Sequence, residues 1–426
     1  MSNVGEPGSI GVIGLGYVGL PLAIRLAESG VEVVGFDTDL DLVRSLSAGS
    51  SPIPDVADSA LAAALAGTLR ISASSSDLAG CETFVICVPT PLSASAGADT
   101  SSIERAVTAI APFVRAGTLV VLESTSYPGT TEEVVAAPLA LATGLIPGED
   151  FCVGFSPERI DPGNRSFSIS NTPKVVSGLR SCCVSRVRDL YASVSDSVVV
   201  ASGVREAEFA KLLENTYRQV NIALVNEMVK FTGALGVDLR EAIRLASTKP
   251  FGFEAFYPGP GVGGHCVPID PQYLAARVES ELGQEFRFVA LAREINAGMP
   301  EFVVGRLADS LDDVSVGLAS ARVLLLGVTY KRDVPDMREA PAEEIVRGLR
   351  KRGALVNYFD PFVDSWTVDG EVVERVGSLE DLPLLFDGVV LVTDHSVFHG
   401  QDYGHLGRVC LDTRGVLAGD GVLGLD

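Results

Sequence analysis

A glycine-rich run a little past the middle of the chain places one thiol where it could act as a nucleophile. Residues 257–264 hold four glycines, Cys266 follows them, and Asp270 lies four residues further on. A nucleophilic thiol needs access and a stabilised thiolate. Glycines leave the sulfur uncovered, and the backbone N–H groups around them support negative charge. The alternative is a tight turn around a buried cysteine, because free cysteine is among the most buried residue types.

A second glycine pattern, near the N-terminus, is typical of a dinucleotide site. The β-rich run 9–13 leads into Gly14, Gly16 and Gly19, and residues 20–27 carry apolar side chains at helical spacing. In such a strand, turn and helix, the first glycine permits the tight turn and the second lets a pyrophosphate approach the backbone. The third lets the helix pack on the strand. The start of the helix then offers N–H groups and a positive dipole end to phosphates.

An acid at the end of the next strand indicates which dinucleotide is bound. Residues 31–36 form a β-rich run, and Asp37 follows it directly, near the offset of roughly 20 residues that this fingerprint requires. A carboxylate there can accept hydrogen bonds from both ribose hydroxyls and repels a 2′-phosphate. The pattern therefore predicts NAD rather than NADP. The alternative is a glycine-rich turn of an α/β sheet that binds no cofactor.

Two further strands carry polar residues at their carboxyl ends. The apolar run 83–88 precedes Pro89 and Thr90, and the run 118–122 precedes Thr125. Ligands of open α/β sheets bind outside the carboxyl ends of the strands, so we expect these residues to contact the cofactor. Helix capping or turn formation is the alternative role of the two threonines.

A long helix in the middle of the chain carries two polar side chains suited to a reaction centre. Residues 206–233 have apolar side chains at helical spacing and no breaker. Lys211 and Asn215 lie four residues apart on this helix and therefore on one face. The lysine could balance an oxyanion, and the asparagine could orient that oxyanion or a water. The alternative is a solvated helix face.

The last part of the chain returns to alternating strands and helices. Residues 272–309 show helical spacing, and four strand-like runs follow, at 322–327, 354–359, 388–392 and 409–411. The loops after these strands carry four basic residues, Lys331, Arg332, Arg338 and Arg414. Positive charge gathered at strand ends of an acidic protein indicates a site for a phosphorylated ligand. Ordinary surface charge is the alternative.

Length and composition limit the class of protein. The chain of 426 residues is too long for one core and suggests two or three domains. Its formal net charge of −22 argues against nucleic acid and anionic membranes as partners. No apolar run approaches the roughly 20 residues that span a bilayer, and residues 1–9 lack the basic start of a signal peptide. The seven cysteines are scattered without a CxxC pair, and the four histidines complete no metal-ligand pattern. We therefore expect a cytoplasmic, reduced and metal-free protein.

With these residues in place, the chain closely resembles the UDP-glucose/GDP-mannose dehydrogenase family, the nucleotide-sugar 6-dehydrogenases. The resemblance covers nearly the whole length and rests on GLGYVGLPLA (14–23), CVPTPL (87–92), ESTSYPGTT (123–131), SPERIDPGN (156–164), KLLENTYRQVNIALVNE (211–227), KPFGFEAFYPGPGVGGHCVPIDPQYL (249–274), GVTYKRDVPDMRE (327–339) and DTRG (412–415). Several blocks in one order are more specific than any single motif. The blocks at 123–131, 156–164 and 257–274 are most similar to the branch that acts on UDP-N-acetylglucosamine.

The resemblance implies an α/β fold of two Rossmann-like parallel-sheet domains joined by a long central helix, assembled as a homodimer or a higher homo-oligomer. Residues 1–204 would form the NAD-binding domain. Residues 205–312 would form a central helical linker and dimerisation domain that carries the cysteine loop. Residues 313–426 would form a Rossmann-like domain that binds the nucleotide of the substrate.

The resemblance also implies roles for single residues. The implied catalytic residues are the thiol Cys266 together with Lys211, Asn215, Asp270 and Glu158. The motifs and the resemblance together assign cofactor contacts to Gly14, Gly16, Tyr17, Val18, Gly19, Asp37, Pro89, Thr90, Thr125 and Arg338. The implied substrate contacts are Glu158, Arg159, Ile160, Lys211, Asn215, Tyr257, Gly263, Lys331, Arg332 and Arg414. The chain departs from the family at Arg332, where a second lysine is common, and at Ile269, where UDP-glucose enzymes have a lysine.

These roles predict an NAD-dependent oxidation of the 6-hydroxyl of a nucleotide sugar to the carboxylate. The reaction removes four electrons, so two NAD react in turn, while Cys266 holds the sugar as a thiohemiacetal and then as a thioester that water hydrolyses. UDP-N-acetylglucosamine is the expected substrate, and UDP- or TDP-glucose and UDP-N-acetylmannosamine are alternatives. The uronate would serve polysaccharide or secondary-metabolite synthesis. Two more distant alternatives are a two-electron dehydrogenase of the 3-hydroxyacid type, which needs no thiol, and a non-catalytic NAD-sensing or sugar-nucleotide-binding protein.

Overall fold

Two sheets provide the cores of two units in this computed structural model. The structure describes residues 8–426 except 54, 94–96, 162, 164, 165, 381, 383 and 384. The first seven residues, used above for the signal-peptide argument, and Pro162 and Asn164 of the block at 156–164 therefore lie outside the described residues. The N-terminal unit comprises Met1–Glu214 and Gln272–Leu282, and the C-terminal unit comprises Asn215–Pro271 and Gly283–Asp426.

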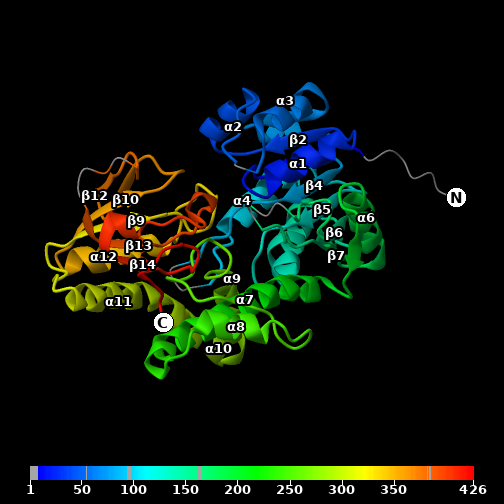
Figure 1. Cartoon of the computed structure of the whole chain (residues 1–426). Helices are drawn as coiled ribbons and strands as arrows, with labels where there is room; N and C mark the ends of the chain where they lie inside the picture. The colour runs from blue at the N-terminus through cyan, green and yellow to red at the C-terminus, as the bar shows by residue number, and fades with distance from the viewer. Residues whose placement is uncertain are drawn as a thin grey trace. The chain divides into compact units, whose positions relative to one another are not determined.

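The sheet of the N-terminal unit is built from short apolar runs rich in Val, Ile and Leu. Its strands are β1 (Ile10–Ile13), β2 (Val33–Phe36), β3 (Leu69–Ser72), β4 (Thr83–Ile86), β5 (Leu119–Leu122), β6 (Cys152–Phe155), β7 (Lys174–Gly178) and β8 (Val198–Val200), and Figure 1 labels β2, β4, β5, β6 and β7 among them. They lie in the order β3-β2-β1-β4-β5-β6-β7-β8. All neighbouring strands are parallel except β6 and β7, which are antiparallel. In the register, Ile13 at the end of β1 lies opposite Phe36 and Ile86.

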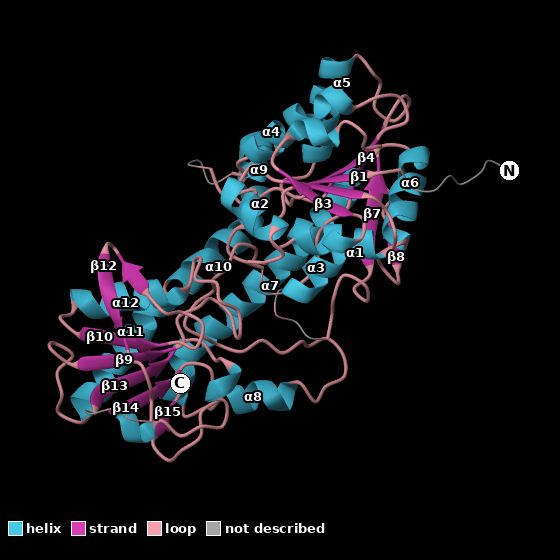
Figure 2. Cartoon of the chain, turned by 90° about the horizontal axis from the view of Figure 1, so that it is seen from above, coloured by secondary structure: helices cyan, strands magenta, loops and turns pink. Residues whose placement is uncertain are grey.

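Helices cover both faces of this sheet, as Figure 2 shows for the cyan helices around the magenta strands. They are α1 (Gly19–Glu28), α2 (Leu40–Ser47), α3 (Asp58–Ala66), α4 (Ser101–Ile110), α5 (Ala137–Thr143) and α6 (Ser181–Ala192), with the short helices η1 (Ser75–Leu78), η2 (Ala111–Phe113) and η3 (Thr131–Ala136). Because side chains of a strand alternate between faces, Val12 and Ile13 enter two different apolar clusters. The sheet is thus buried on both sides, as a parallel sheet requires.

The expected long helix is present as α7 (Val204–Thr232), which has 29 residues and belongs to both units. It is followed by η4 (Gly233–Leu235) and α8 (Leu239–Ala246). The helical stretch expected over 272–309 is divided into α9 (Asp270–Leu282), α10 (Arg287–Ala297) and α11 (Met299–Asp313). One division falls at Gly283, whose φ of +61° a helix cannot accommodate.

The sheet of the C-terminal unit repeats the same plan. Its strands are β9 (Arg322–Leu326), β10 (Leu355–Phe359), β11 (Trp366–Val368), β12 (Glu371–Arg375), β13 (Phe386–Leu391), β14 (Gly407–Asp412) and β15 (Val422–Leu423), and its other elements are α12 (Pro341–Lys351), η5 (Ser396–Phe398) and η6 (Gly404–Leu406). The order is β11-β12-β10-β9-β13-β14-β15, with only the pair β11 and β12 antiparallel among these described strands.

The strand order confirms the predicted fold class. In the N-terminal sheet the third, second and first strands precede the fourth, fifth and sixth, which is the doubly wound order. The parallel strands of the C-terminal sheet follow the same order, β12-β10-β9-β13-β14-β15, and the antiparallel strand β11 is added at the edge beside β12. The order reverses between β1 and β4 in one sheet and between β9 and β13 in the other. Ligands of such sheets bind at this switch point, outside the carboxyl ends of the strands. None of the described helices combines the length and the apolar character that a membrane span requires.

Candidate active site

The turn between β1 and α1 leaves space where a pyrophosphate would lie. Gly14 has a φ of +90°, and a Cβ atom there would stand 2.7 Å from the carbonyl oxygen of Cys87. A Cβ atom at Gly19 would stand 1.8 Å from the carbonyl oxygen of Gly14. At Gly16 a Cβ atom would meet nothing within 4 Å. The backbone is therefore crowded at the first and third glycines and open at the second, which fits a bound dinucleotide.

Asp37 joins the end of β2 to this turn. Its carboxylate accepts hydrogen bonds from the N–H groups of Leu15 at 2.8 Å and of Asp39 at 3.0 Å. Val18 is the N-cap residue of α1 and gives the first turn of the helix no side-chain hydrogen bond. That end of the helix suits phosphate oxygens. Together with Tyr17 in the same turn, these residues fit NAD.

The loops after β4 and β5 are bonded to each other at the same edge of the sheet. The Thr90 hydroxyl donates to the carbonyl oxygen of Thr125 at 2.6 Å, and the Ser124 hydroxyl donates to that of Val88 at 2.7 Å. The Tyr273 hydroxyl of α9 donates to the carbonyl oxygen of Thr90. Thr90 therefore joins two strand-end loops and does not cap a helix, while Pro89 beside it is exposed.

A buried charge network lies beyond β5 and holds Glu158 in place. Lys174, at the start of β7, donates to Glu158 at 2.9 Å and to Glu123 at 3.2 Å. The other oxygen of Glu123 accepts a hydrogen bond from the Tyr191 hydroxyl of α6. All four side chains are nearly removed from water, with exposed fractions of 9% for Lys174, 13% for Glu158 and 0% for Glu123. The Lys174 ammonium group thus forms ion pairs with two buried carboxylates inside the N-terminal unit.

This network separates the protonation behaviour of the two carboxylates. Burial raises the pKa of Glu123, and the nearby Glu158 adds to the rise. Together they outweigh the attraction of Lys174, and the pKa is about 7. Burial also opposes ionisation of Glu158, but Lys174, the N–H of Ile160 and the charge of Lys211 outweigh it and lower its pKa. Although burial alone would lower it, the two carboxylates raise the pKa of Lys174. Glu158 is therefore the ionised member of the pair, and Glu123 is the one that holds a proton near neutral pH.

The predicted residues of the polar loop after β6 gather around Glu158. One Glu158 oxygen accepts from the N–H groups of Arg159 at 2.8 Å and of Ile160 at 2.7 Å. The Arg159 guanidinium pairs with Glu214 of α7 at 2.6 Å. Lys211 of the same helix acts on the charge of Glu158. The N-terminal unit therefore brings together four of the predicted residues, Glu158, Arg159, Ile160 and Lys211.

The face of α7 that carries these side chains is not solvated. Glu208 is 1% exposed and accepts hydrogen bonds from the N–H of Gly129 at 2.6 Å and from the N–H and hydroxyl of Thr131 at 2.8 and 2.7 Å. Asn215 is 3% exposed. The alternative of a solvated helix face is therefore wrong for these positions.

In the C-terminal unit, the predicted thiol lies beside a buried amide and carboxylate pair. Cys266 is exposed, so the alternative of a buried cysteine is wrong. Its carbonyl oxygen accepts a hydrogen bond of 2.9 Å from the N–H of Asp270, the first residue of α9, which ties the backbone of Cys266 to the start of that helix. The Asp270 carboxylate, 4% exposed, accepts a hydrogen bond of 2.6 Å from the Asn215 amide of α7. Asp270 thus bonds another element and is more than a cap of its own helix.

The glycines before Cys266 let their loop lie directly on the loop after β9. A Cβ atom at Gly263 would stand 2.6 Å from the carbonyl oxygen of Glu339 and 2.9 Å from the Cβ of Tyr330. The N–H of Gly264, which has a φ of +85°, donates to the carbonyl oxygen of Arg338 at 3.2 Å. Glycine is needed at these positions because backbone and an aromatic ring occupy the space of a side chain.

Tyr257 and Arg414 lie at the start of this cysteine loop. Tyr257 is 48% exposed, with the Arg240 guanidinium 5.8 Å from its ring centroid. Arg240 also donates to the carbonyl oxygens of Pro258 at 3.1 Å and Thr413 at 3.0 Å, which ties the loop to the segment after β14. Arg414 is half-buried and donates to the carbonyl oxygen of Val392 at 2.9 Å.

A buried histidine shapes the loop after β9. Nδ1 of His395 accepts from the N–H of Asp333 at 3.0 Å, and Nε2 lies 3.0 Å from the carboxylate of Asp360 at the end of β10. The histidine is fully buried. Because Nδ1 accepts, the ring proton is on Nε2 and is donated to Asp360. This histidine is therefore a structural link between three strand-end loops.

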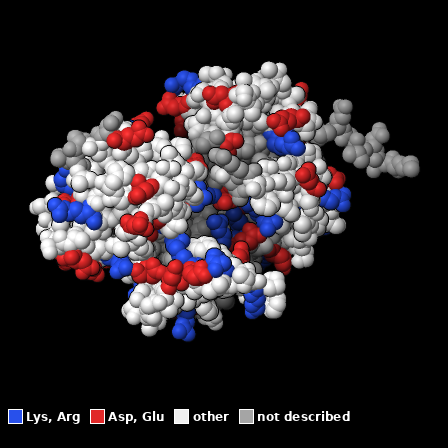
Figure 3. Space-filling view, viewed as in Figure 1, with Lys and Arg blue, Asp and Glu red and all other residues white. Residues whose placement is uncertain are grey.

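The predicted basic residues of this edge are held by acids. Arg332 pairs with Asp394, and Arg338 pairs with Asp336 through bonds of 2.9 and 2.5 Å, while Lys331 is half-buried. Because the side chains of Arg332 and Arg338 are 46% and 52% exposed, ordinary surface charge remains the alternative explanation for them. Acidic side chains occur at many places on the face shown in Figure 3, in keeping with the net charge of −22. An anionic ligand therefore depends on such local cations.

Sequence reasoning missed three members of the buried network as functional candidates. Glu123 directly follows β5. The rule that ligands bind outside the carboxyl ends of the strands, which predicted a role for Thr125, therefore applies equally to Glu123. Lys174 and Tyr191 lie in segments without a motif, and no sequence signal indicates that they meet Glu123 and Glu158.

A Rossmann-like unit with this turn and this acid is typical of NAD-binding proteins. Comparison with known proteins narrows the class. Family models of the UDP-glucose/GDP-mannose dehydrogenase family match the NAD binding domain at residues 8–195, the central domain at 205–298 and the UDP binding domain at 324–419. The chain belongs to this family and is an NAD-dependent nucleotide-sugar dehydrogenase.

Relatives of the chain share nearly its full length. The UDP-N-acetyl-D-mannosamine dehydrogenase of Pyrococcus horikoshii is 36% identical over 416 residues, 96% of each chain. The UDP-N-acetyl-D-glucosamine 6-dehydrogenase of Pseudomonas aeruginosa is 36% identical over 393 residues, 91% of each chain. A solved structure of the Pyrococcus horikoshii UDP-D-ManNAc dehydrogenase superposes with a TM-score of 0.89 at 34% identity, covering 98% of this chain and 99% of that one. The predicted family and the predicted cofactor NAD are thereby confirmed.

Proposed function

We propose that the protein oxidises the 6-hydroxyl of a UDP-N-acetylhexosamine to the carboxylate through a covalent intermediate on Cys266. UDP-N-acetylglucosamine is the first candidate. The observation that carries the proposal is the exposed thiol of Cys266, joined through the backbone of Asp270 to a buried carboxylate and amide pair. A binding protein has no need of a nucleophile in such a setting, and a two-electron dehydrogenase has no need of a thiol.

The thiol would hold the sugar between two oxidations. NAD, when bound at the turn of Gly14, Gly16 and Gly19, supplies the hydride acceptor of each oxidation. The Cys266 thiolate adds to the C6 aldehyde and forms a thiohemiacetal, whose oxidation leaves a thioester. Water then adds to the thioester, the carbon–sulfur bond breaks, and the thiolate returns. Exposure of Cys266 on a glycine-rich loop supports this role, since a sugar can reach its sulfur.

Lys211 and Asn215 would stabilise the charged oxygen at C6. The two side chains are four residues apart on α7 and share one of its faces. An ammonium group balances the alkoxide and each later oxyanion, and loss of one such donor costs about 10²–10³ in rate. The hydrogen bond from the Asn215 amide to Asp270 fixes the orientation of this amide.

Glu158 and Asp270 would act on the water that releases the product. The network of Lys174 and Glu123 supports Glu158 in this role, because it keeps that carboxyl ionised although it is buried. Lys174 is then a positioning residue. An ionised, desolvated carboxylate can accept a proton from water as the thioester is hydrolysed.

The strand ends of the C-terminal unit would bind the UDP group. Lys331, Arg332 and Arg414 supply the positive charge for a diphosphate, and their loops adjoin the cysteine loop at Gly263 and Gly259. The sugar would meet Arg159 and Ile160, and Arg338 would serve the cofactor together with Tyr17, Val18, Pro89, Thr90 and Thr125. This corresponds to a division into an NAD-binding domain at 1–204, a central domain at 205–312 and a UDP-binding domain at 313–426.

UDP-N-acetylmannosamine is the second candidate substrate. The Pyrococcus horikoshii relative of that name and the Pseudomonas aeruginosa relative named for UDP-N-acetylglucosamine are equally identical to this chain, at 36%. Overall identity therefore does not separate the two epimers. UDP-glucose, without the acetamido group, is a third candidate.

The test combines a substrate panel with one variant. The purified chain is given each UDP-sugar with NAD, and NADH and uronate are counted. We expect two NADH per uronate with one N-acetylhexosamine, and loss of uronate formation by more than about 10³-fold in Cys266→Ser with NAD and UDP binding retained. One NADH per substrate, or uronate at the normal rate from Cys266→Ser, would exclude the covalent mechanism.

We also propose a homodimer formed through α7. Phe209, Leu213, Tyr217, Leu224 and Phe231 are each 43–56% exposed and recur at intervals of four and seven residues along this helix. Exposed apolar stripes of this kind indicate a protein contact. Light scattering should give the mass of a dimer for the natural chain and of a monomer for Leu224→Glu, and a monomeric natural chain would refute the proposal.

A further inference from the structure

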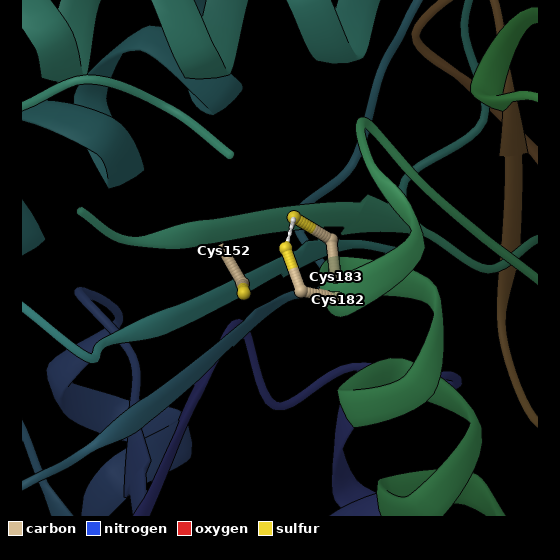
Figure 4. Close-up of side chains that lie close together, drawn as sticks. All are labelled: Cys152, Cys182 and Cys183. Carbon is tan, nitrogen blue, oxygen red and sulfur yellow. Dashed lines mark hydrogen bonds between the residues drawn. The ribbon is translucent and has the colours of Figure 1, made fainter. Parts of the chain in front are cut away.

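Three cysteines from two elements converge at the amino end of β6. Cys152 is the first residue of this strand, and Cys182 and Cys183 lie in the first turn of α6. Their three sulfur atoms all lie within 4.8 Å of one another, and those of Cys182 and Cys183 are 4.0 Å apart (Figure 4). Spacing along the chain hides this cluster, because no CxxC pair is present.

The sulfur positions suit a single metal ion. Zinc binds thiolates at about 2.3 Å, so two sulfurs on one ion lie about 3.8–4.0 Å apart in tetrahedral or trigonal geometry. Cys182 and Cys183 already meet this separation, and Cys152 needs to approach them by less than about 1 Å. The strand and the helix start that carry the thiols are both ordered elements, so the ligands are nearly in place before binding.

The surroundings favour thiolates. The first N–H groups of a helix have no intrahelical acceptor and form the positive end of its dipole, and α6 has no side-chain cap. Cys182 and Cys183 lie in the first turn of α6, so their thiols are close to this positive end of the helix.

Access is provided by one of the three thiols. Cys183 is fully buried and Cys152 is 8% exposed, whereas Cys182 is exposed and its thiol donates to the carbonyl oxygen of Gly148 at 3.4 Å. An ion can therefore enter from the side of Cys182, and water can supply a fourth ligand there. Because one of the three sulfurs is exposed, a metal ion can bind to the folded chain and a chelator can remove it.

We propose that Cys152, Cys182 and Cys183 bind one thiophilic metal ion, with Zn²⁺ as the expected occupant. Thiolate ligands select soft or borderline ions of this kind, and binding releases the thiol protons. The site lies at the amino end of β6, whereas the Glu158 loop follows its carboxyl end at Phe155. Its role is therefore structural: the ion joins α6, which carries Tyr191, to β6 in the core of the N-terminal unit.

The test uses the full chain with Cys266→Ser, which removes an exposed thiol as a competing ligand. The reduced, chelator-treated protein is titrated with Cd²⁺, whose bonds to sulfur absorb in the ultraviolet, and Zn²⁺ is then added as competitor. We expect saturation at one Cd²⁺ per chain, displacement by Zn²⁺, and a higher Tm with either ion. Cys152→Ser and Cys183→Ser should each weaken binding by more than the roughly 100-fold that loss of a supporting group costs. Cys81→Ser, at another buried cysteine, should bind as before.

Two results would overturn the proposal. One is that no Cd²⁺ signal is seen, or that the signal is unchanged in both Cys152→Ser and Cys182→Ser. Because Cys182 is exposed, the Cys182→Ser variant keeps the test valid even if the variants of the buried cysteines do not fold. The other is a cluster that takes up neither ion but forms a disulfide between two of its thiols when peroxide oxidises them. The cluster would then be a redox pair and not a metal site.

Discussion

Apart from the edge strand β11, the parallel strands of the two sheets share a doubly wound order, but the residues at the point where that order reverses differ. After β1 the chain makes a short glycine turn that is open at Gly16. After β9 it also begins with a glycine, Gly327, whose Cβ would stand 2.2 Å from the carbonyl oxygen of Thr393. There, however, a long loop follows that is held by buried His395. Topology decides where a ligand binds, and the residues of the turn decide which ligand it is.

The two edges also offer different groups to a phosphate. The N-terminal edge offers backbone N–H groups and a helix start, so it needs no cation. The C-terminal edge offers side-chain cations, and each of the two arginines is held by an acid, Arg332 by Asp394 and Arg338 by Asp336. In an acidic protein such acids keep the guanidinium groups in place. The comparison predicts that damage to the glycine turn at Gly16 leaves UDP binding unaffected and that loss of Arg332 leaves NAD binding unaffected.

The largest effects are expected where a crowded glycine is lost from the segment that follows β1 or β9. Gly19→Ala would place a Cβ atom 1.8 Å from the carbonyl oxygen of Gly14, and Gly327→Ala would place one 2.2 Å from that of Thr393. Because backbone cannot move aside cheaply, each variant should lose more than about 3 kcal/mol of stability. Thermal unfolding followed by circular dichroism measures this. Gly16→Ala is the matched control and should keep its Tm, and a Gly19→Ala variant as stable as the natural chain would refute the crowding.

The next effect concerns the buried cation of the N-terminal unit. Lys174→Met leaves Glu123 and Glu158 without their shared ammonium group in a buried setting. We expect a loss of about 3–5 kcal/mol in urea unfolding. Arg347 of the C-terminal unit pairs with three acids at the surface, so Arg347→Met should cost no more than about 1 kcal/mol. Equal losses in the two variants would show that burial does not set the difference.

Binding measurements sharpen the comparison of the two edges. Gly16→Ala fills the open space of the first turn and should weaken NAD binding about 10-fold or more while UDP binding stays the same. Arg332→Gln removes a charged donor and should weaken UDP binding by about 10–100-fold while NAD binding stays the same. Calorimetric titration of both variants with NAD and with UDP tests whether each variant loses affinity for one ligand alone. If either variant loses both ligands equally, the two edges do not act independently.

The smallest effect is a pH dependence that belongs to the N-terminal unit alone. Burial raises the pKa of Glu123 from 4.5 to about 7, so the folded chain holds a proton there that the unfolded chain has lost. Stability therefore falls as the pH rises from about 4.5 through 7, by about 1 kcal/mol between pH 6 and pH 8. Glu123→Gln removes this decline. The Tm of this variant minus the Tm of the natural chain should therefore increase as the pH rises.

Tyr191→Phe provides a control for this pH dependence. The Tyr191 hydroxyl donates to Glu123 and lowers its pKa. Without that donor, the pKa of Glu123 rises further, and the decline in stability should move to higher pH. A difference in Tm between the natural chain and Glu123→Gln that is constant from pH 5 to pH 8 would contradict the assignment.

Local patterns predicted much of this molecule because their chemistry is contained in neighbouring residues. The turn of Gly14, Gly16 and Gly19, the acid at Asp37 and the exposed thiol of Cys266 each follow from a short stretch whose backbone conformation is decided nearby. The spacing of Lys211 and Asn215 placed both on one face of a helix. The antiparallel β7 and the division of the stretch 272–309 into three helices were not predicted, since partner strands and single glycines decide them.

The sequence by itself determined the fold class, the family and the cofactor, because these depend on short motifs and on their order along the chain. Only the tertiary structure decided that Lys174 and Tyr191 meet Glu123 and Glu158, that Glu208 is buried, and that Cys152 lies beside Cys182 and Cys183. Contacts between residues far apart in the chain depend on how the sheet and its helices pack. A buried group acquires its protonation state or its ligand character from those contacts, and no local pattern records them.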